Sequence, residues 1–482
     1  MISIVRGLAL IVLLGYWASA AAANSEGRPP NVVLILTDNQ GAWTLGCYGN
    51  PDIRTPHIDR LAREGMLFER CYSSNAVCSP TRATLLTGLI PSQHGVHSYL
   101  TAGGAQMGPR AYSTIAEFRS LPKLLAEAGY TCGLSGKWHL GDNLNPQEGF
   151  SYWVTMPHGH TRTFYAADVI EGGKVRKEPR YLTDFWTDHG VKFIEQNKDK
   201  PFFLFLAYNG PYGLGESMLA PETNRHTAYY ADKQLKSFPR EKMHPWLAGN
   251  KRLFNNVEAM RRYAAEVSGV DDGVGRILAA LEAHNIEGET LVIFTADQGL
   301  ACGQSGFWGM GDHTRPLTAF DSMTHVPLIY RHPGHIRPDH RSDILVSNYD
   351  FLPTMLNYLG LKDQSPLPLG EGRVRELPGR SYSGSLNGKD HAWDNTIFFE
   401  YENTRAVRTD EWKYVSRFPD GPNELYHLKS DPVERRNVVD QPAHAAQQQN
   451  LCDRLDEFFT SYADPRYDLN RGGRSKAARR SE

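Results

Sequence analysis

Uninterrupted runs of apolar residues recur along the chain, and each ends in polar or glycine-rich positions. Such runs are typical of strands buried on both faces of a parallel sheet. They predict strands at 31–37, 131–135, 202–208, 291–295, 326–330 and 343–346. Apolar residues at helical spacing predict helices near 56–64, 79–87, 120–127, 256–284 and 351–359. Strands alternating with helices predict an α/β fold, in which helices sandwich a large, mostly parallel sheet.

The pattern changes beyond residue 385. Short strands separated by turn residues are predicted at 395–401, 405–409, 412–416 and 424–428, with a helix at 443–462. These elements predict a small C-terminal antiparallel sheet with one packed helix. We therefore expect an α/β catalytic domain over 28–385 and an α+β subdomain over 386–465. Residues 466–482 are basic and carry few apolar side chains, so we expect a disordered tail there.

The first residues have the pattern of a secretory signal peptide. Arg6 precedes the apolar run 7–17, and small residues occupy most of 18–23. The run is shorter than the roughly 20 apolar residues of a membrane span. We therefore predict a signal peptide at 1–23, export to a periplasm or the medium, and no stable membrane insertion.

Composition narrows the class of protein further. The formal net charge is −2, which argues against bulk nucleic-acid binding. Six cysteines in 482 residues are too few for a disulfide scaffold. We therefore expect the chain to fold around an ordinary apolar core rather than a disulfide framework.

One of these cysteines begins the segment Cys78–Arg82, with the sequence CSPTR. Proline is tolerated in the first turn of a helix, so Pro80 predicts that a helix starts here. Cys78 would lie at the positive end of that helix, where free backbone N–H groups attract anions. The thiol can be a nucleophile of low pKa, a metal ligand, or the precursor of a more reactive group.

Two acidic residues follow predicted strands that are far apart in the sequence. Asp38 follows the strand at 31–37, and Asp297 follows the strand at 291–295. Ligands bind outside the carboxyl ends of parallel strands, so both carboxylates are expected at one site. Carboxylate and amide oxygens are hard ligands, and Asn39 and Gln298 add amides to the set. The alternative for Asp297-Gln298-Gly299 is that it is only a turn at the end of a strand.

Four separated motifs together resemble the type I sulfatases of the alkaline-phosphatase-like superfamily. The motifs are TDNQ at 37–40, CSPTR at 78–82, GKWHLG at 136–141 and TADQG at 295–299. The resemblance covers nearly the whole mature chain. It implies that a formylglycine-generating enzyme oxidises Cys78 to formylglycine, whose hydrate is the nucleophile for sulfate ester hydrolysis.

The resemblance also implies the other members of the site. One Ca²⁺ ion would be bound by Asp38, Asn39, the modified Cys78, Asp297 and Gln298. Arg82 would support the formylglycine. Lys137 would bind a sulfate oxygen, and His139 would hydrogen-bond the formylglycine hydroxyl, contact the substrate and assist aldehyde regeneration.

The chain departs from the family at several of these positions. Asn39 stands where a second aspartate is more common, which leaves two carboxylates and suggests weaker Ca²⁺ binding or another divalent ion. Tyr212 stands where relatives carry a histidine that protonates the leaving alcohol, and we expect Tyr212 to take that role. Met310 replaces a cation that contacts the sulfate, and we expect His313 to supply this contact.

The substrate is expected to be a sulfated glycan, because aromatic residues in predicted loops can stack on a sugar ring, although the same rings could equally belong to the core. These residues are Tyr99, Trp153, Tyr165 and Trp308. Three alternatives stay open: a small aryl sulfate as substrate, a phosphonate or phosphodiester hydrolase with the same metal site and nucleophile, and a catalytically impaired paralogue that binds sulfated glycans.

Overall fold

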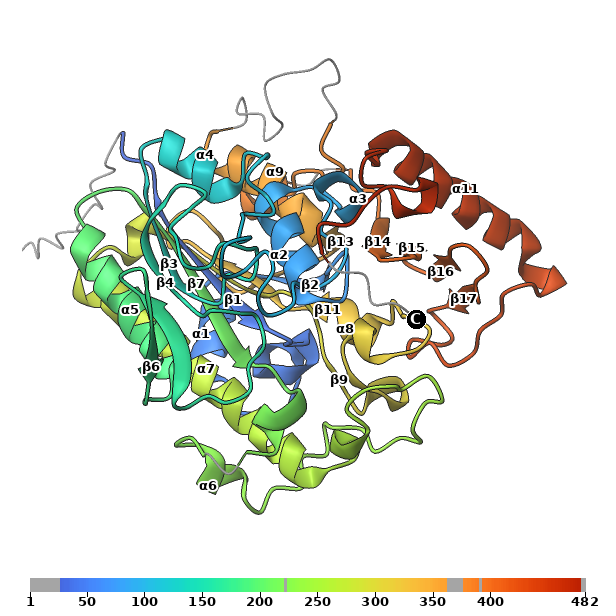
Figure 1. Ribbon diagram of the computed structural model, residues 1–482, viewed down its shortest axis with the longest axis horizontal. Coiled ribbons are helices and arrows are strands. Elements are labelled where there is room, and N and C mark those ends of the chain that lie inside the picture. The colour runs from blue at the N-terminus through green and yellow to red at the C-terminus, as the bar shows by residue number, and fades with distance from the viewer. Residues whose placement is uncertain (1–26, 221–222, 362–375, 390–391, 478–482) are drawn as a thin grey trace, which may run out of the picture.

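A computed structural model describes residues 27–220, 223–361, 376–389 and 392–477. The predicted signal peptide at 1–23 lies outside these residues. The described chain forms a mixed α/β domain with a large central sheet and a separate small antiparallel sheet near its C-terminus (Figure 1). No helix within the described ranges is long and apolar enough to cross a membrane.

The large sheet has the strand order β11-β2-β12-β8-β1-β7-β3-β4-β5-β6, with β13 paired to β2. Its strands are β1 (Asn31–Asp38), β2 (Met66–Tyr72), β3 (Thr131–Gly136), β4 (Phe150–Thr155), β5 (Ala167–Glu171), β6 (Lys174–Glu178), β7 (Phe202–Pro211), β8 (Thr290–Ala296), β11 (His325–Val326), β12 (Leu328–Arg331) and β13 (His340–Ser347). The central run from β8 to β4 is parallel, and antiparallel strands flank it on both sides. This confirms the predicted fold class.

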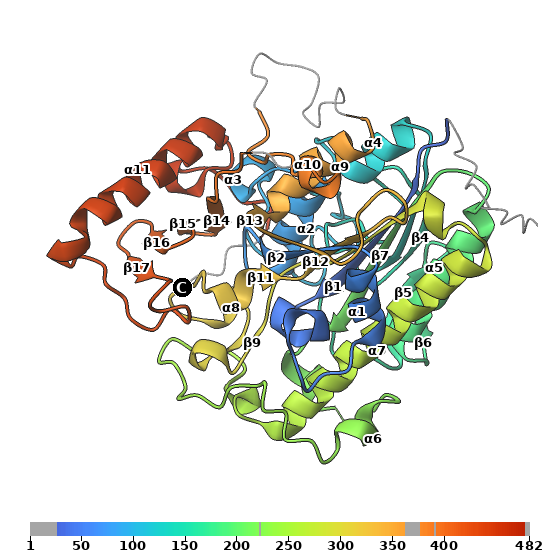
Figure 2. The same cartoon turned by 180° about the vertical axis from the view of Figure 1, so that it is seen from behind.

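Helices cover both faces of this sheet. The main helices are α1 (Pro56–Arg63), α2 (Cys78–Thr87), α4 (Leu121–Glu127), α5 (Leu182–Asn197), α7 (Val257–Ala283) and α9 (Phe351–Tyr358); α3 (Pro91–His94), α6 (Thr227–Tyr230), α8 (Asp321–Thr324) and α10 (Ser383–Leu386) are short. Alternate residues of β1 point to opposite faces. Val33 and Ile35 pack in a core with α1, α5 and α7, whereas Val32 and Leu34 pack with α2, α4 and α9 (Figures 1 and 2).

The strand predicted at 326–330 is divided in the structure. Val326 ends β11 and Leu328 begins β12, with Pro327 between them. Proline has no backbone N–H to donate, so it interrupts the ladder. Both parts pair antiparallel to their neighbours rather than parallel.

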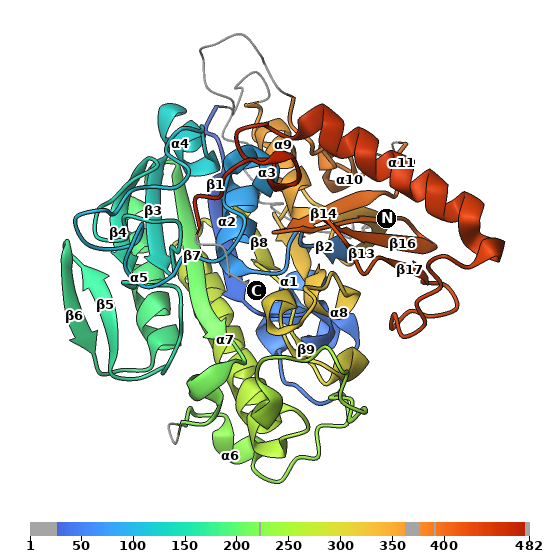
Figure 3. The ribbon, with the colours of Figure 1, turned by 45° about the vertical axis from the view of Figure 1, so that its right-hand side comes forward.

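The C-terminal sheet contains β14 (Ile397–Tyr401), β15 (Thr404–Arg408), β16 (Trp412–Arg417) and β17 (Glu424–His427) in sequential antiparallel order. Helix α11 (Ala445–Tyr462) packs along it through Leu451 and Leu455 (Figure 3). The expected domain boundary at 385/386 falls inside α10, whose Leu386 belongs to the core of the large domain.

The segment 466–477 differs from the disordered tail that we expected. The Tyr467 side chain is buried, and the backbone carbonyl of Tyr467 lies 2.8 Å from Nε2 of His97. Asp468 accepts a hydrogen bond of 2.7 Å from Arg405, and Lys476 donates one of 2.7 Å to the Thr114 carbonyl. A basic composition did not prevent packing, because these few polar side chains have specific partners on the folded domain. The predicted tail beyond 477 lies outside the described residues.

Candidate active site

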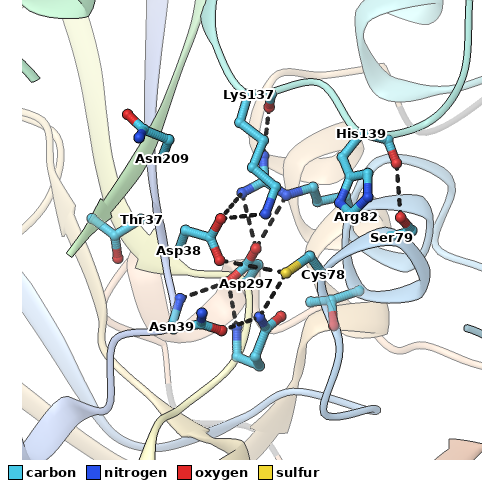
Figure 4. A network of polar contacts seen from close by, with 12 residues as sticks. Thr37, Asp38, Asn39, Cys78, Ser79, Arg82, Lys137, His139, Asn209 and Asp297 are labelled. Carbon is cyan, nitrogen blue, oxygen red and sulfur yellow. Dashed lines mark hydrogen bonds and ion pairs between the residues drawn. The ribbon is translucent and has the colours of Figure 1, made fainter. Parts of the chain in front are cut away.

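Asp38 and Asp297 lie side by side because their strands are neighbours. Asp38 is the last residue of β1, Asp297 directly follows β8, and the two strands pair in parallel. The Cys78 sulfur lies 3.4 Å from Asp38 Oδ1, and all three side chains are buried. The ligand atoms of the three lie within 4.8 Å of one another (Figure 4).

Cys78 is the first residue of α2, and it places its thiol against this acidic pair. Pro80 is therefore in the first turn, where its missing N–H costs no helical hydrogen bond. Burial and the neighbouring Asp38 raise the pKa of the Cys78 thiol above its usual range. A thiolate nucleophile of low pKa, one of the three fates left open above, is not favoured by this environment.

Two buried cations neutralise the carboxylates. Arg82 donates to Asp297 Oδ2 from Nε at 3.1 Å and from Nη2 at 2.9 Å. The ammonium of Lys137 forms an ion pair with Asp38. Burial, followed by the repulsion of Asp297, raises the pKa of Asp38 to about 6 in spite of both cations. Lys137 is fully buried and pairs with a carboxylate here, so its expected contact with a sulfate oxygen stays a prediction.

Asn39 and Gln298 complete the cluster with amide groups. Gln298 donates from Nε2 to Asn39 Oδ1 and, at 3.1 Å, to the sulfur of Cys78. Its other amide atom, Oε1, is buried and has no hydrogen-bond partner among the described residues. An unpaired buried acceptor is costly. Two carboxylates with an unpaired amide oxygen beside them form a set that fits a hard divalent cation.

His139 lies just beyond β3, with its backbone in the left-handed region at φ 62°. Its Nε2 lies 2.9 Å from the Leu100 carbonyl, which can only accept, so Nε2 carries the proton. The other nitrogen, Nδ1, is buried without a hydrogen-bond partner among the described residues. Burial and then Lys137 lower the pKa of His139 well below its usual value, so the ring is neutral. Nδ1 is then available to accept a proton.

A cavity of about 530 Å³ opens above this cluster. It is lined by Cys78, Tyr99, Thr101, Ala102, His139, Gly159, His160, Thr161, Arg162, Tyr212, Leu214, Gly215, Glu216, Asn250, Met310, Asp312 and His313. The cavity therefore brings together the predicted nucleophile, His139, Tyr212 and His313. It is large enough to enclose a sugar-sized ligand.

The aromatic residues expected to stack on a sugar divide into two groups. Tyr99 lines the cavity. Trp153 and Trp308 are buried in the hydrophobic core, and Tyr165 stacks on Tyr181 at 5.4 Å between ring centroids. For these three residues the expectation was wrong, because an apolar ring in a segment predicted to be a loop packed inward.

Sequence reasoning missed His160 and Arg162, which line the cavity from the connection between β4 and β5. The local signal was the polar segment 158–162, with the sequence HGHTR, directly after a buried strand. Without the fold, nothing in the segment indicates that it faces Cys78.

A mostly parallel α/β sheet that carries a buried cysteine, two carboxylates and two cations at its strand ends defines a hydrolase of the alkaline-phosphatase-like superfamily. More specifically, the chain belongs to the sulfatase family. The family model described as Sulfatase matches residues 30–361, and the model described as N-sulphoglucosamine sulphohydrolase, C-terminal, matches residues 313–461. The protein is thus a sulfuric ester hydrolase by family.

Several named sulfatases are similar in sequence to this chain over most of their lengths. An N-acetylglucosamine-6-O-sulfatase of Bacteroides thetaiotaomicron is 27% identical, over 94% of this chain and 91% of its own. An N-acetylgalactosamine-6-sulfatase of Mus musculus is 30% identical, over 88% and 84%. A solved structure in complex with its substrate, D-glucosamine-2-N,6-O-disulfate, superposes with a TM-score of 0.69 at 25% identity, over 90% of this chain and 98% of that one.

Proposed function

We propose that this protein removes sulfate from a sulfated glycan in an exported compartment, using a formylglycine made from Cys78 and one Ca²⁺ ion. The observation that carries the proposal is the buried juxtaposition of the Cys78 sulfur with Asp38 and Asp297 beneath the cavity. The sugar sulfates named for the relatives support a glycan as substrate. The signal peptide pattern at 1–23 supports export.

The residues that would bind the metal ion all belong to the buried cluster described above. Asp38, Asn39, Asp297, Gln298 and the modified Cys78 would hold Ca²⁺. The bound ion would supply positive charge beside the sulfate oxygens. A formylglycine-generating enzyme is the implied partner in maturation, and the hydrate of the formylglycine would supply the attacking oxygen.

His139, Arg82 and Lys137 would transfer a proton, orient a carboxylate and balance charge in the proposed reaction. The free Nδ1 of the neutral His139 is suited to accept a proton from a hydroxyl of residue 78. Arg82 fixes the orientation of Asp297 through two hydrogen bonds to one oxygen. Lys137 balances the charge of Asp38. With a metal ion bound to that carboxylate, the Lys137 ammonium would be free to contact a sulfate oxygen.

The modification is tested by the mass of the peptide that contains Cys78, from protein of native source. Conversion of the thiol to an aldehyde lowers the peptide mass by roughly 18 Da. The peptide that contains the buried Cys132 is the internal control and should keep its thiol mass. An unmodified Cys78 in every molecule would remove the proposed nucleophile.

The reaction is tested by parallel turnover of three substrates: a 6-sulfated N-acetylhexosamine, nitrophenyl sulfate and a nitrophenyl phosphodiester. We expect the sugar sulfate to have the highest kcat/KM. Faster cleavage of the phosphodiester would assign the protein to the phosphonate and phosphodiester hydrolases. Tight binding of the sugar sulfate without product would instead show a glycan-binding paralogue.

A further inference from the structure

The leaving alcohol of a sulfated sugar is a poor leaving group and needs a proton as the S–O bond breaks. Tyr212, the residue that stands where relatives carry the acid, is badly suited to donate it. Its side chain is only 6% exposed, and its ring lies under the Lys137 ammonium, 5.7 Å from the ring centroid. An ordinary phenol, with a pKa of about 10, is also a weak acid at neutral pH. The site therefore needs another proton donor.

His160 is placed to be that donor. It lines the cavity that also exposes Cys78 and His139. The centroid of its ring lies 6.2 Å from that of His139 and 5.3 Å from that of Tyr99. In the described part of the chain, neither ring nitrogen of His160 is used in a hydrogen bond. The imidazole is thus half-buried beside the reaction centre and still free to act.

The loop that carries His160 is attached to the strand end that carries Tyr212. The backbone of Thr161 hydrogen-bonds the Tyr212 phenol, and Thr161 Oγ1 donates to the Asn209 carbonyl at 3.2 Å. The His160 backbone N–H donates to Nδ1 of His158 at 3.3 Å. His160 directly precedes Thr161, the residue whose backbone hydrogen-bonds the Tyr212 phenol, so these contacts restrain the position of His160.

We propose that His160 is the catalytic acid of this enzyme and protonates the leaving oxygen of the sugar. The proposal rests on the function proposed above. As the hydroxyl oxygen of residue 78 bonds to sulfur, its proton passes to Nδ1 of His139. The bond between sulfur and the sugar oxygen breaks at the same time, and its electron pair takes the proton from the imidazolium of His160. The product alcohol leaves, and the neutral His160 regains a proton from water.

The bound ester favours the form of His160 that this step needs. In the free protein, burial and then Lys137 lower the pKa of His160 to about 4. A sulfate monoester carries negative charge into the same cavity, which favours the charged imidazolium. His313 lines the same cavity, with its Nδ1 2.7 Å from an oxygen of Asp312 and its ring against Gly249 and Gly309, so it is the competing candidate in the test below.

The first test compares two leaving groups in His160→Asn, with Tyr212→Phe and His313→Asn as matched variants. Nitrophenolate leaves without a proton, whereas a sugar alkoxide does not. We expect His160→Asn to lower kcat on the sugar sulfate by about 100-fold or more, the usual contribution of a general acid. Its kcat on nitrophenyl sulfate should fall no more than about threefold. Equal losses on both substrates, or a selective loss in Tyr212→Phe or His313→Asn instead, would overturn the proposal.

The second test reads the ring itself and needs no active nucleophile. In the Cys78→Ala protein with ¹⁵N-labelled histidine, addition of inorganic sulfate near neutral pH should move one pair of imidazole nitrogen signals toward the doubly protonated form. That pair should be missing in Cys78→Ala/His160→Asn. No protonation with sulfate bound would overturn the role of His160. The two proposals can also fail separately. If the wild-type protein cleaves no sulfate ester, the proposed function is wrong. If His160 is still protonated when sulfate binds, its position as a proton donor beside the bound anion is nevertheless supported.

Discussion

Arg82 places two of its N–H groups on one oxygen of Asp297, although the two residues lie 215 positions apart in the chain. Both side chains are fully buried. Because a buried charge that loses its partner keeps its desolvation cost, we expect Arg82→Gln to lower the free energy of unfolding of metal-free protein by about 3–5 kcal/mol. Urea unfolding measures this change.

A surface pair provides the matched control. Lys177 lies 3.1 Å from Asp168, and both side chains are exposed. Lys177→Gln should cost less than about 1 kcal/mol. If Arg82→Gln were no more destabilising than this control, the pair with Asp297 would not be a structural element of the site.

Asn39 lies in the proposed Ca²⁺ site, where a carboxylate would add a charged ligand. Because Ca²⁺ affinity rises with the number of charged ligands, Asn39→Asp should bind Ca²⁺ more tightly than the wild type, and Asp297→Ala should lose most of the affinity. Calorimetric titration of metal-stripped protein measures both. The amide of Asn39 also donates to the Tyr212 carbonyl at 2.9 Å, so we expect Asn39→Asp to be less stable without metal. Unchanged affinity in both variants would refute the metal assignment.

Gly159 lies directly against His139. A Cβ at this glycine would be 2.1 Å from the imidazole, closer than any real contact. Gly159→Ala should therefore displace the ring and lower kcat/KM by about tenfold or more, since small misplacements at a reacting centre are costly. Gly288→Ala is the control, because a Cβ there meets nothing within 4 Å. Similar activity in both variants would show that the loop at 158–162 moves aside at little cost, and that Gly159 is not needed to position His139.

Glu266 is a buried carboxyl that should make stability depend on pH. Burial raises its pKa from 4.5 to about 8 in the folded protein. The native state then holds a proton that the unfolded chain releases, so this contribution is complete below about pH 4.5 and is lost as the pH rises through about 8.

Glu266→Gln removes that proton uptake. Relative to the wild type, we expect the variant to gain unfolding free energy between about pH 5 and about pH 9, by an amount on the order of a few kcal/mol. Urea unfolding at both pH values measures the difference. Parallel stability curves for the two proteins would mean that Glu266 titrates normally.

Local sequence was enough to predict the elements that hold the cluster. The apolar run that became β1 ends in Asp38, and Asp297 directly follows β8. The start of α2 at Cys78 followed from Pro80. In contrast, β6 (Lys174–Glu178, KVRKE) escaped prediction because an edge strand exposed to water needs no apolar run.

Periodicity, caps and strand ends are properties of neighbouring residues, so the sequence by itself determined the α/β class and the order of its elements. The prediction that Cys78 becomes the nucleophile rests on the resemblance of four motifs to the sulfatases. Contacts between distant segments depend on how whole elements pack, and the tertiary structure alone decided them. It placed Lys137 against Asp38, turned Trp308 into the core and brought His160 to the cavity that Cys78 also lines. Those placements depend on the side-chain packing between elements, which no local pattern records.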